Sequence, residues 1–136
     1  MELIKHNDAV LAIIIRNNYA GEGIHFFTPP EYSQQLAYMH HPEGHEIMPH
    51  VHNEVKREVK YTNEVLIIRK GKLECDFYTE QQEYLESRTL EAGDIILLIC
   101  GGHGFKCLND AEFFEIKQGP YAGENDKTRF QPNKNQ

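Results

Sequence analysis

Short apolar stretches separated by turn residues recur along the chain at the spacing of β-strands. Two of them, "AVLAIIIR" at 9–16 and "IILLIC" at 95–100, are almost uninterrupted and predict buried strands. Between residues 72 and 77 polar and apolar residues alternate, so that Leu73, Cys75 and Phe77 share one face of a half-buried strand. Convincing helix signals are scarce. We therefore expect an all-β domain.

The clearest local unit is the stretch 64–78, "EVLIIRKGKLECDFY", which predicts a hairpin that turns at Lys70 and Gly71. Further strands are expected at 24–27, 34–41 and 81–90, and a last pair is split at Asn109 and Asp110. Roughly eight to ten short strands at this spacing favour a sandwich or barrel over an α/β layout.

Composition narrows the functional classes. The 136 residues suit one domain with a hydrophobic core, and the net charge of −7 argues against a nucleic-acid surface. The chain opens without a signal-peptide pattern, and its longest apolar stretch is too short to span a bilayer, so no membrane partner is expected. The three cysteines form no C-x-x-C pair, which favours buried thiols in a reducing cytoplasm.

The candidate chemistry begins at "PHVH", residues 49–52, which places His50 and His52 one residue apart. On a strand, residues i and i+2 point to the same side, so both imidazoles would share one space; two surface histidines are the alternative. Glu64 on a neighbouring strand and His103 after a buried strand could join the two histidines as further metal ligands. Three imidazoles and one carboxylate suit Fe, Mn, Co, Ni, Cu or Zn better than Ca or Mg.

Three blocks carry a resemblance to a known family. They read "GHEIMPHVH" from Gly44, "EVLIIRKG" from Glu64 and "GDIILLICGGH" from Gly93, and in this order they resemble the two motifs of the cupin superfamily. The resemblance implies a cupin-type double-stranded β-helix, a jelly-roll barrel, at 34–118. Strands and a loop at 1–33 would pack on it, and 119–136 would form a polar tail.

Carried over position by position, the family's metal ligands fall on His50, His52, Glu64 and His103, and imply one divalent transition metal, with Fe, Mn, Zn, Ni and Co as candidates. Eleven residues, 53–63, separate the second histidine from the glutamate, where the family has only a few. This makes Glu54 and Glu58 rival ligands. Glu64 is preferred because it keeps the spacing to the turn glycine. The second block also lacks the proline that usually precedes its histidine.

A cupin barrel encloses a cavity that suits one small-molecule substrate. Isomerisation there would need a general acid and base near the metal, and the candidates are Tyr38, His40, Glu115 and Lys117. Glu115 and Lys117 share one face of the last predicted strand, which either lines the pocket or points outward.

Cupins include isomerases, epimerases, dioxygenases, decarboxylases and non-catalytic binders. Short single-domain members occur among enzymes of sugar metabolism, so the resemblance implies a metal-dependent isomerase or epimerase that acts on a carbohydrate-like substrate. An iron-dependent dioxygenase and a non-catalytic binding barrel are the alternatives. Cupins commonly pair through edge strands, which implies a homodimer; the stretch 9–16 is apolar enough for such an edge, or is a central strand.

Overall fold

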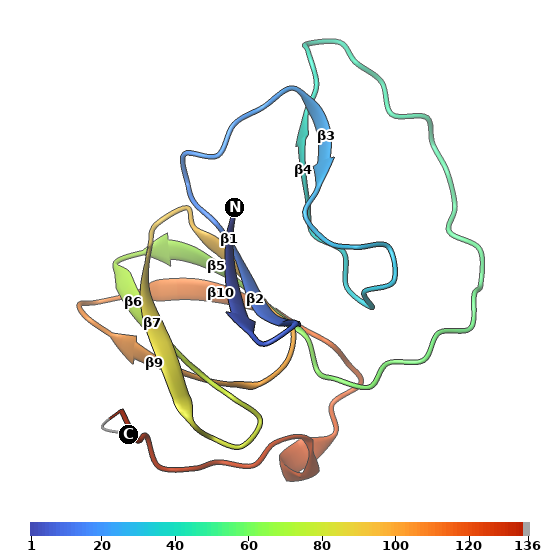
Figure 1. Ribbon diagram of the computed structural model, residues 1–136. Coiled ribbons are helices and arrows are strands. Elements are labelled where there is room, and N and C mark those ends of the chain that lie inside the picture. The colour runs from blue at the N-terminus through green and yellow to red at the C-terminus, as the bar shows by residue number, and fades with distance from the viewer. Residues whose placement is uncertain (135–136) are drawn as a thin grey trace. The chain divides into compact units, whose positions relative to one another are not determined.

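The computed structural model describes residues 1–134, and this range consists of strands, loops and one short 3-10 helix (Figure 1). The elements are β1 (Glu2–His6), β2 (Ala9–Ile15), β3 (Gly23–Phe26), β4 (Ala37–His40), β5 (Glu64–Lys70), β6 (Lys72–Tyr78), β7 (Tyr84–Glu91), β8 (Ile95–Leu98), β9 (Gly102–Cys107), β10 (Glu112–Lys117) and η1 (Gly123–Asp126). All strand pairs are antiparallel. The all-β prediction is confirmed.

The chain forms two compact units. One, here called the sandwich, contains Met1–Tyr19 and the chain from Tyr61 onward; the other, the insert, is Ala20–Lys60. These limits differ from the predicted boundaries at 33 and 118, because β1 and β2 belong to the same sheet as β5 and β8. No helix in the described range is long and apolar enough to cross a membrane.

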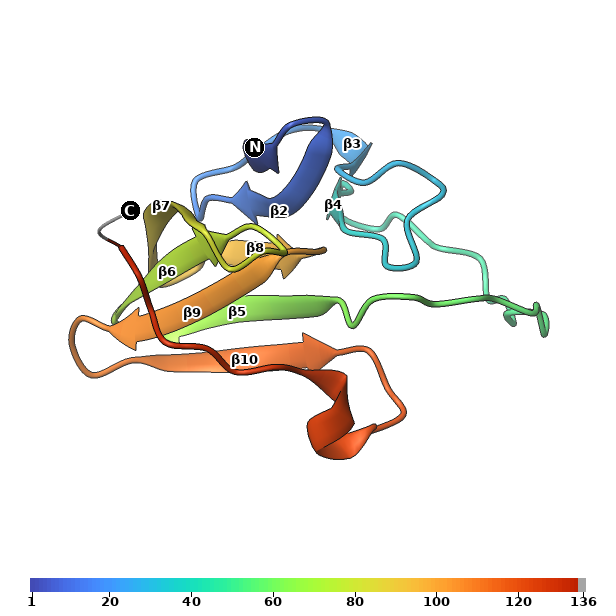
Figure 2. The same cartoon turned by 60° about the horizontal axis from the view of Figure 1, so that its bottom comes forward.

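The sandwich consists of two packed sheets (Figure 2). One sheet has five strands in the order β1-β2-β8-β5-β10, and the other has three in the order β7-β6-β9. Both sheets contribute to one core cluster, in which Ile14, Leu66 and Ile96 of the first meet Phe77 and Leu90 of the second. The burial of these apolar side chains between the sheets is the main stabilising term of this unit.

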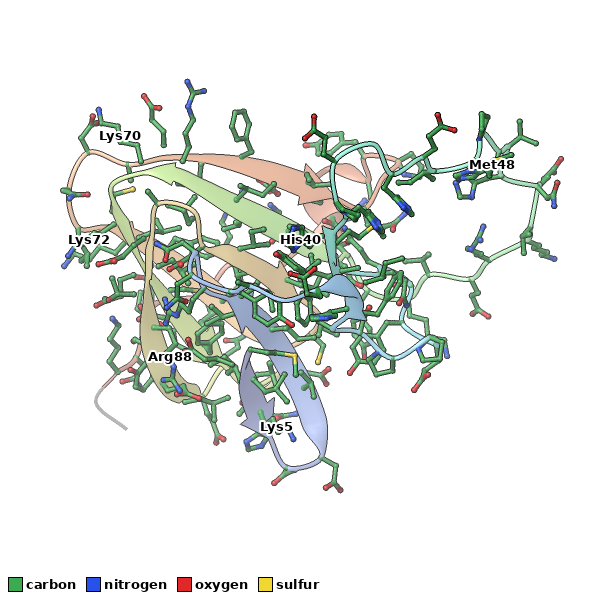
Figure 3. The ribbon with its side chains drawn as sticks, turned by 90° about the horizontal axis from the view of Figure 1, so that it is seen from above. Lys5, His40, Met48, Lys70, Lys72 and Arg88 are labelled. Atoms are coloured by element: carbon green, nitrogen blue, oxygen red, sulfur yellow. The ribbon has the colours of Figure 1, made fainter. Side chains whose placement is uncertain are left out.

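The predicted hairpin at 64–78 is wrong, because β5 and β6 lie in different sheets. Gly71 forms the corner between them with φ of 79°, and a Cβ there would lie 2.2 Å from the carbonyl oxygen of Asp110. The backbone N–H of Lys72 donates to the side chain of Asn109 at 2.7 Å, so this corner packs on the turn between β9 and β10. Lys70 and Lys72 flank the corner in Figure 3. Crossing between sheets lets the apolar faces of both arms cover the same core.

The stretch 9–16 is a central strand, since β2 lies between β1 and β8. The outer strands of the five-stranded sheet are β1 and β10, and every residue of β10 is exposed. Of the cysteines predicted to be buried, Cys75 is buried, Cys100 is half-buried and Cys107 is exposed.

The insert contains one hairpin, β3 paired with β4, followed by an irregular segment. His50 and His52 lie in that segment and are exposed, so the prediction that they share a strand is wrong. A strand needs a pairing partner and an apolar face. Here Pro49 has no N–H to donate, and Val51 and Val55 stay exposed among charged residues.

The C-terminal segment returns onto the three-stranded sheet. The ring of Phe130 meets that of Tyr78 edge-on, with centroids 5.1 Å apart. Lys134 forms ion pairs with Asp76 at 2.8 Å and with Glu74 at 3.0 Å. This segment therefore covers the face of β6 that points away from the core.

Candidate metal and acid–base site

Glu64 and His103 meet at one end of the sandwich. Glu64 begins β5, and the alternate residues Leu66 and Ile68 belong to the core cluster, so Glu64 lies on the core-facing side. His103 pairs with the core residue Phe77 in the register of β6 and β9, which places it on the same side. The His103 Nε2 atom is 2.9 Å from Glu64 Oε2. The two sheets thus bring an imidazole nitrogen and a carboxylate oxygen within hydrogen-bonding distance of each other.

This contact changes the acidity of the carboxyl group. Hydrogen bonding from His103 holds the pKa of Glu64 below its usual value, although partial burial opposes the shift. The carboxylate is therefore kept ionised at neutral pH, the form that coordinates a metal. A partly buried carboxylate against an imidazole matches the donor chemistry of zinc and iron sites. These two residues fit half of the predicted ligand set.

Glu115 and Lys117 also lie on the core-facing side. In the register of β5 and β10, Glu115 is opposite Leu66 and Lys117 is opposite Glu64. The register therefore favours the core-facing side for both residues, although both lie on an exposed outer strand. Partial burial and a hydrogen bond that Glu115 donates to Glu64 raise the pKa of Glu115, while the Lys117 Nζ atom lies 3.9 Å from Glu115 Oε1. Four residues predicted from the sequence therefore converge in the sandwich.

Asn63 fixes the start of β5 and was not among the predicted site residues. It is buried, and its side-chain amide donates to the carbonyl oxygen of Ile99 at 2.9 Å. Its own carbonyl oxygen accepts from the backbone N–H of Gln118 at 3.0 Å. These bonds tie the strand carrying Glu64 to the ends of β8 and β10. In the sequence, only its position directly before a carboxylate and an apolar run distinguishes this asparagine.

The other predicted site residues belong to the insert. The rings of His50 and His52 lie edge to face with centroids 5.2 Å apart, and His50 Nδ1 is 2.9 Å from the carbonyl oxygen of Met48. On β4, His40 Nδ1 lies 2.9 Å from the carbonyl oxygen of Gly21, and Tyr38 lies opposite His25 in the hairpin register. Figure 3 labels His40 on this strand.

The predicted metal ligands therefore form two pairs, one in each unit. Over residues 1–134, no group of three or more His, Cys, Asp or Glu side chains is arranged to hold a metal ion. The rival carboxylates Glu54 and Glu58 are exposed in the irregular segment.

The sandwich also contains a cavity of about 300 Å³. Its wall is made by three turns, those between β1 and β2, β6 and β7, and β8 and β9, and includes Asp8, Glu80, Cys100 and Gly101. Gly101 precedes His103 by two residues, so the cavity adjoins the strand that carries the imidazole. Its volume falls at the lower end of the range for small-molecule sites.

Comparison with known proteins adds no assignment: no protein-family model, curated protein or solved structure matches this chain.

Proposed function

We propose that this protein binds one divalent transition metal ion and that Glu64 and His103 of the sandwich are among its ligands. The observation that supports the proposal best is the 2.9 Å contact between Glu64 and His103, because it joins residues from two sheets that were both predicted as metal ligands from the sequence. His50 and His52 of the insert stay predicted ligands, and their rings form a close pair of the imidazole type that transition metals bind.

The proposed fold is the cupin-type jelly-roll barrel. Its support is the way successive strands change sheets: β5 and β6 lie in different sheets, and so do β8 and β9, and β9 and β10. Such crossings are typical of double-sheet jelly rolls, whereas a meander would keep consecutive strands together.

The proposed activity is isomerisation or epimerisation of a small carbohydrate-like substrate. A bound metal ion would polarise a carbonyl or hydroxyl group of the substrate. Moving a proton also requires an acid and a base of matched strength. Glu115 suits the acid role, because its raised pKa favours the protonated carboxyl beside the ionised Glu64. Lys117 places a positive charge beside the same carboxyl group. Tyr38 and His40 of the insert stay predictions for the acid or base role.

The test is the metal content of untagged protein, measured by elemental mass spectrometry. We expect near-stoichiometric metal in the wild type and a loss of at least about tenfold in Glu64→Ala, His103→Ala and His50→Ala. Glu112→Ala is the matched control, because this carboxylate also lies on β10 but is exposed and forms its ion pair with Arg69 at 3.7 Å. Folded wild-type protein that holds no metal after reconstitution would refute the proposal.

The identity of the metal separates the possible reactions. Iron would direct the next assay to oxygen consumption, the reaction of a dioxygenase, which uses the same ligand types. Zinc, nickel or manganese would direct it to isomerisation of aldoses and ketoses. In that assay Glu115→Gln should keep the metal and lose about 100-fold in rate. Full metal occupancy without turnover would indicate a binding barrel.

A further inference from the structure

The cavity of about 300 Å³ in the sandwich is lined by different residues from those proposed to bind the metal. Its wall consists of three turns, at 6–9, 79–81 and 100–101, together with Leu11 of β2. Glu64, His103 and Glu115 are not among its lining residues. A ligand in this cavity would therefore contact a separate set of side chains.

Hydrogen bonds within the protein hold the walls of the cavity in place. The backbone N–H of Ile99 donates to the carbonyl oxygen of Leu11 at 2.8 Å, which fixes the start of the turn between β8 and β9. In the turn between β6 and β7, the N–H of Thr79 donates to the carbonyl oxygen of Glu83 at 2.8 Å, and its hydroxyl accepts from the N–H of Glu83 at 3.2 Å. Gly101 has φ of 74°, and a Cβ there would lie 2.9 Å from the Leu11 side chain. The cavity is thus formed before any ligand binds, as is usual for small-molecule sites.

The buried part of the cavity is apolar, and its exposed part is acidic. Leu11 is 4% exposed, and the thiol of Cys100 is half-buried beside it in the wall. Burial raises the pKa of Cys100, and the charge of Glu80 raises it further, so the thiol stays protonated and uncharged at neutral pH. Asp8 and Glu80 contribute exposed carboxylates from two different turns.

The lining provides no fixed positive charge to balance these two carboxylates. Among the described residues that line the cavity, none is lysine or arginine, and His6 would be positive only when protonated. Lys5, labelled on β1 in Figure 3, is exposed and is not a lining residue. Glu80 accepts a hydrogen bond from the uncharged Tyr61 hydroxyl at 3.4 Å. A cleft lined by charge of one sign attracts ions of the opposite sign, and the net charge of −7 strengthens this attraction.

We infer that this cavity binds a small organic cation in which an ammonium group is attached to a compact apolar body. The apolar body would lie against Leu11 and Cys100, and the ammonium group would donate hydrogen bonds to Asp8 and Glu80. The volume limits the body to a single ring or a short chain. A bare metal ion would find too few oxygen ligands here, since Ca²⁺ takes about six to eight. The inference does not depend on the proposed metal site.

The test uses three compounds that share a cyclohexyl ring and differ in the charge of the attached group: cyclohexylammonium, cyclohexanol and cyclohexanecarboxylate. Their dissociation constants for the full chain would be measured at pH 7 by two-dimensional NMR titration. We expect the cation to bind about tenfold more tightly than the alcohol, and the carboxylate to bind more weakly than both. The largest shift changes should occur at 6–11, 79–81 and 99–101. Added salt should reduce the preference for the cation, because both carboxylates are exposed.

Variants locate the effect. Asp8→Asn and Glu80→Gln should each reduce the preference for the cation over the alcohol by about threefold, and the double variant should abolish it. Each change removes a charge but keeps the size and polarity of the side chain, so the affinity for cyclohexanol should not change. Glu83→Gln is the matched control, because Glu83 is an exposed carboxylate at the same turn as Glu80 but does not line the cavity. It should leave the preference unchanged.

Four results would overturn the inference. They are equal affinities for the cation and the alcohol, a preference that survives in the double variant, shift changes outside the three turns, and no binding of the cation by folded protein at about 10 mM. Protein treated with a chelator to remove metal should bind the cation as tightly as untreated protein. Failure of this inference is therefore distinguishable from failure of the proposed function, which is judged by metal content.

Discussion

Asp94 connects the turn before β8 to the end of β2, and its removal should destabilise the sandwich strongly. Its side chain is 2% exposed. The carboxylate accepts hydrogen bonds from the backbone N–H groups of Asn17 and Glu91, both at 2.8 Å, and from the Arg16 guanidinium at 2.9 Å. Alanine at this position would leave three donors without their acceptor.

The magnitude follows from those three bonds. An unsatisfied buried donor costs about 1–3 kcal/mol, and removing one member of a buried ion pair costs about 3–5 kcal/mol. Arg16 retains its ion pair with Glu2 and is partly exposed, so its share of the loss is small. We therefore expect Asp94→Ala to lower the free energy of unfolding by about 3–5 kcal/mol, and Asp94→Asn, which keeps one acceptor oxygen, by about half as much.

The free energies would be measured by urea unfolding followed by circular dichroism, with the wild type and both variants at the same pH and protein concentration. Asp110→Ala is the control, because its side chain is 86% exposed and forms an ion pair with Lys70 at the surface. The control should change the free energy of unfolding by less than about 0.5 kcal/mol. A loss in Asp94→Ala no larger than in the control would refute this account of the turn.

Two further predictions concern acid stability and assembly. The hydrogen bond from Arg16 holds the pKa of Glu2 below 4.5, so this pair stabilises the fold above that pH and loses its effect as the pH falls through the lowered pKa. Glu2→Gln should therefore lower the melting temperature at pH 7 and converge with the wild type in acid, once the pH is below the lowered pKa; a difference independent of pH would contradict this. The predicted homodimer was assigned to an edge at 9–16, but β2 is a central strand. We expect pairing instead at the outer edge of β10, where Phe114 and Ile116 are exposed on the side away from the core. We expect Phe114→Lys to sediment as a monomer, and a monomeric wild type at tens of micromolar would contradict the pairing.

The positions of most strands could be predicted from the sequence. The apolar runs at 9–16 and 95–100 became β2 and β8, and the arms of 64–78 became β5 and β6 within a residue of the expected limits. These strands could be predicted because alternation of polar and apolar residues, and runs of β-branched residues, are visible within the few residues of each strand. β1 was not predicted, since its five residues mix charged and apolar side chains; each of them pairs with a residue of β2 once the chain has turned at Asn7 and Asp8.

The candidate site, too, could be predicted only in part. Glu64 and His103 could be selected from residue type and spacing, but their contact requires β5 and β9 to face one core from opposite sheets. The orientation of Glu115 and Lys117 could not be decided from "EFFEIK", because phenylalanine occurs on both faces of that strand. Only the register with β5 assigns them to the core side.

The sequence by itself determined that this protein is built from short strands and that it contains a set of imidazoles and carboxylates suited to a transition metal. The tertiary structure decided that Gly71 is a corner between sheets, that β2 is a central strand, and that Glu64, His103 and Glu115 share one end of the core. The reason is physical. Which side of a strand a residue occupies depends on its immediate neighbours, whereas the partner of each strand depends on how apolar surfaces distant in the chain are buried together.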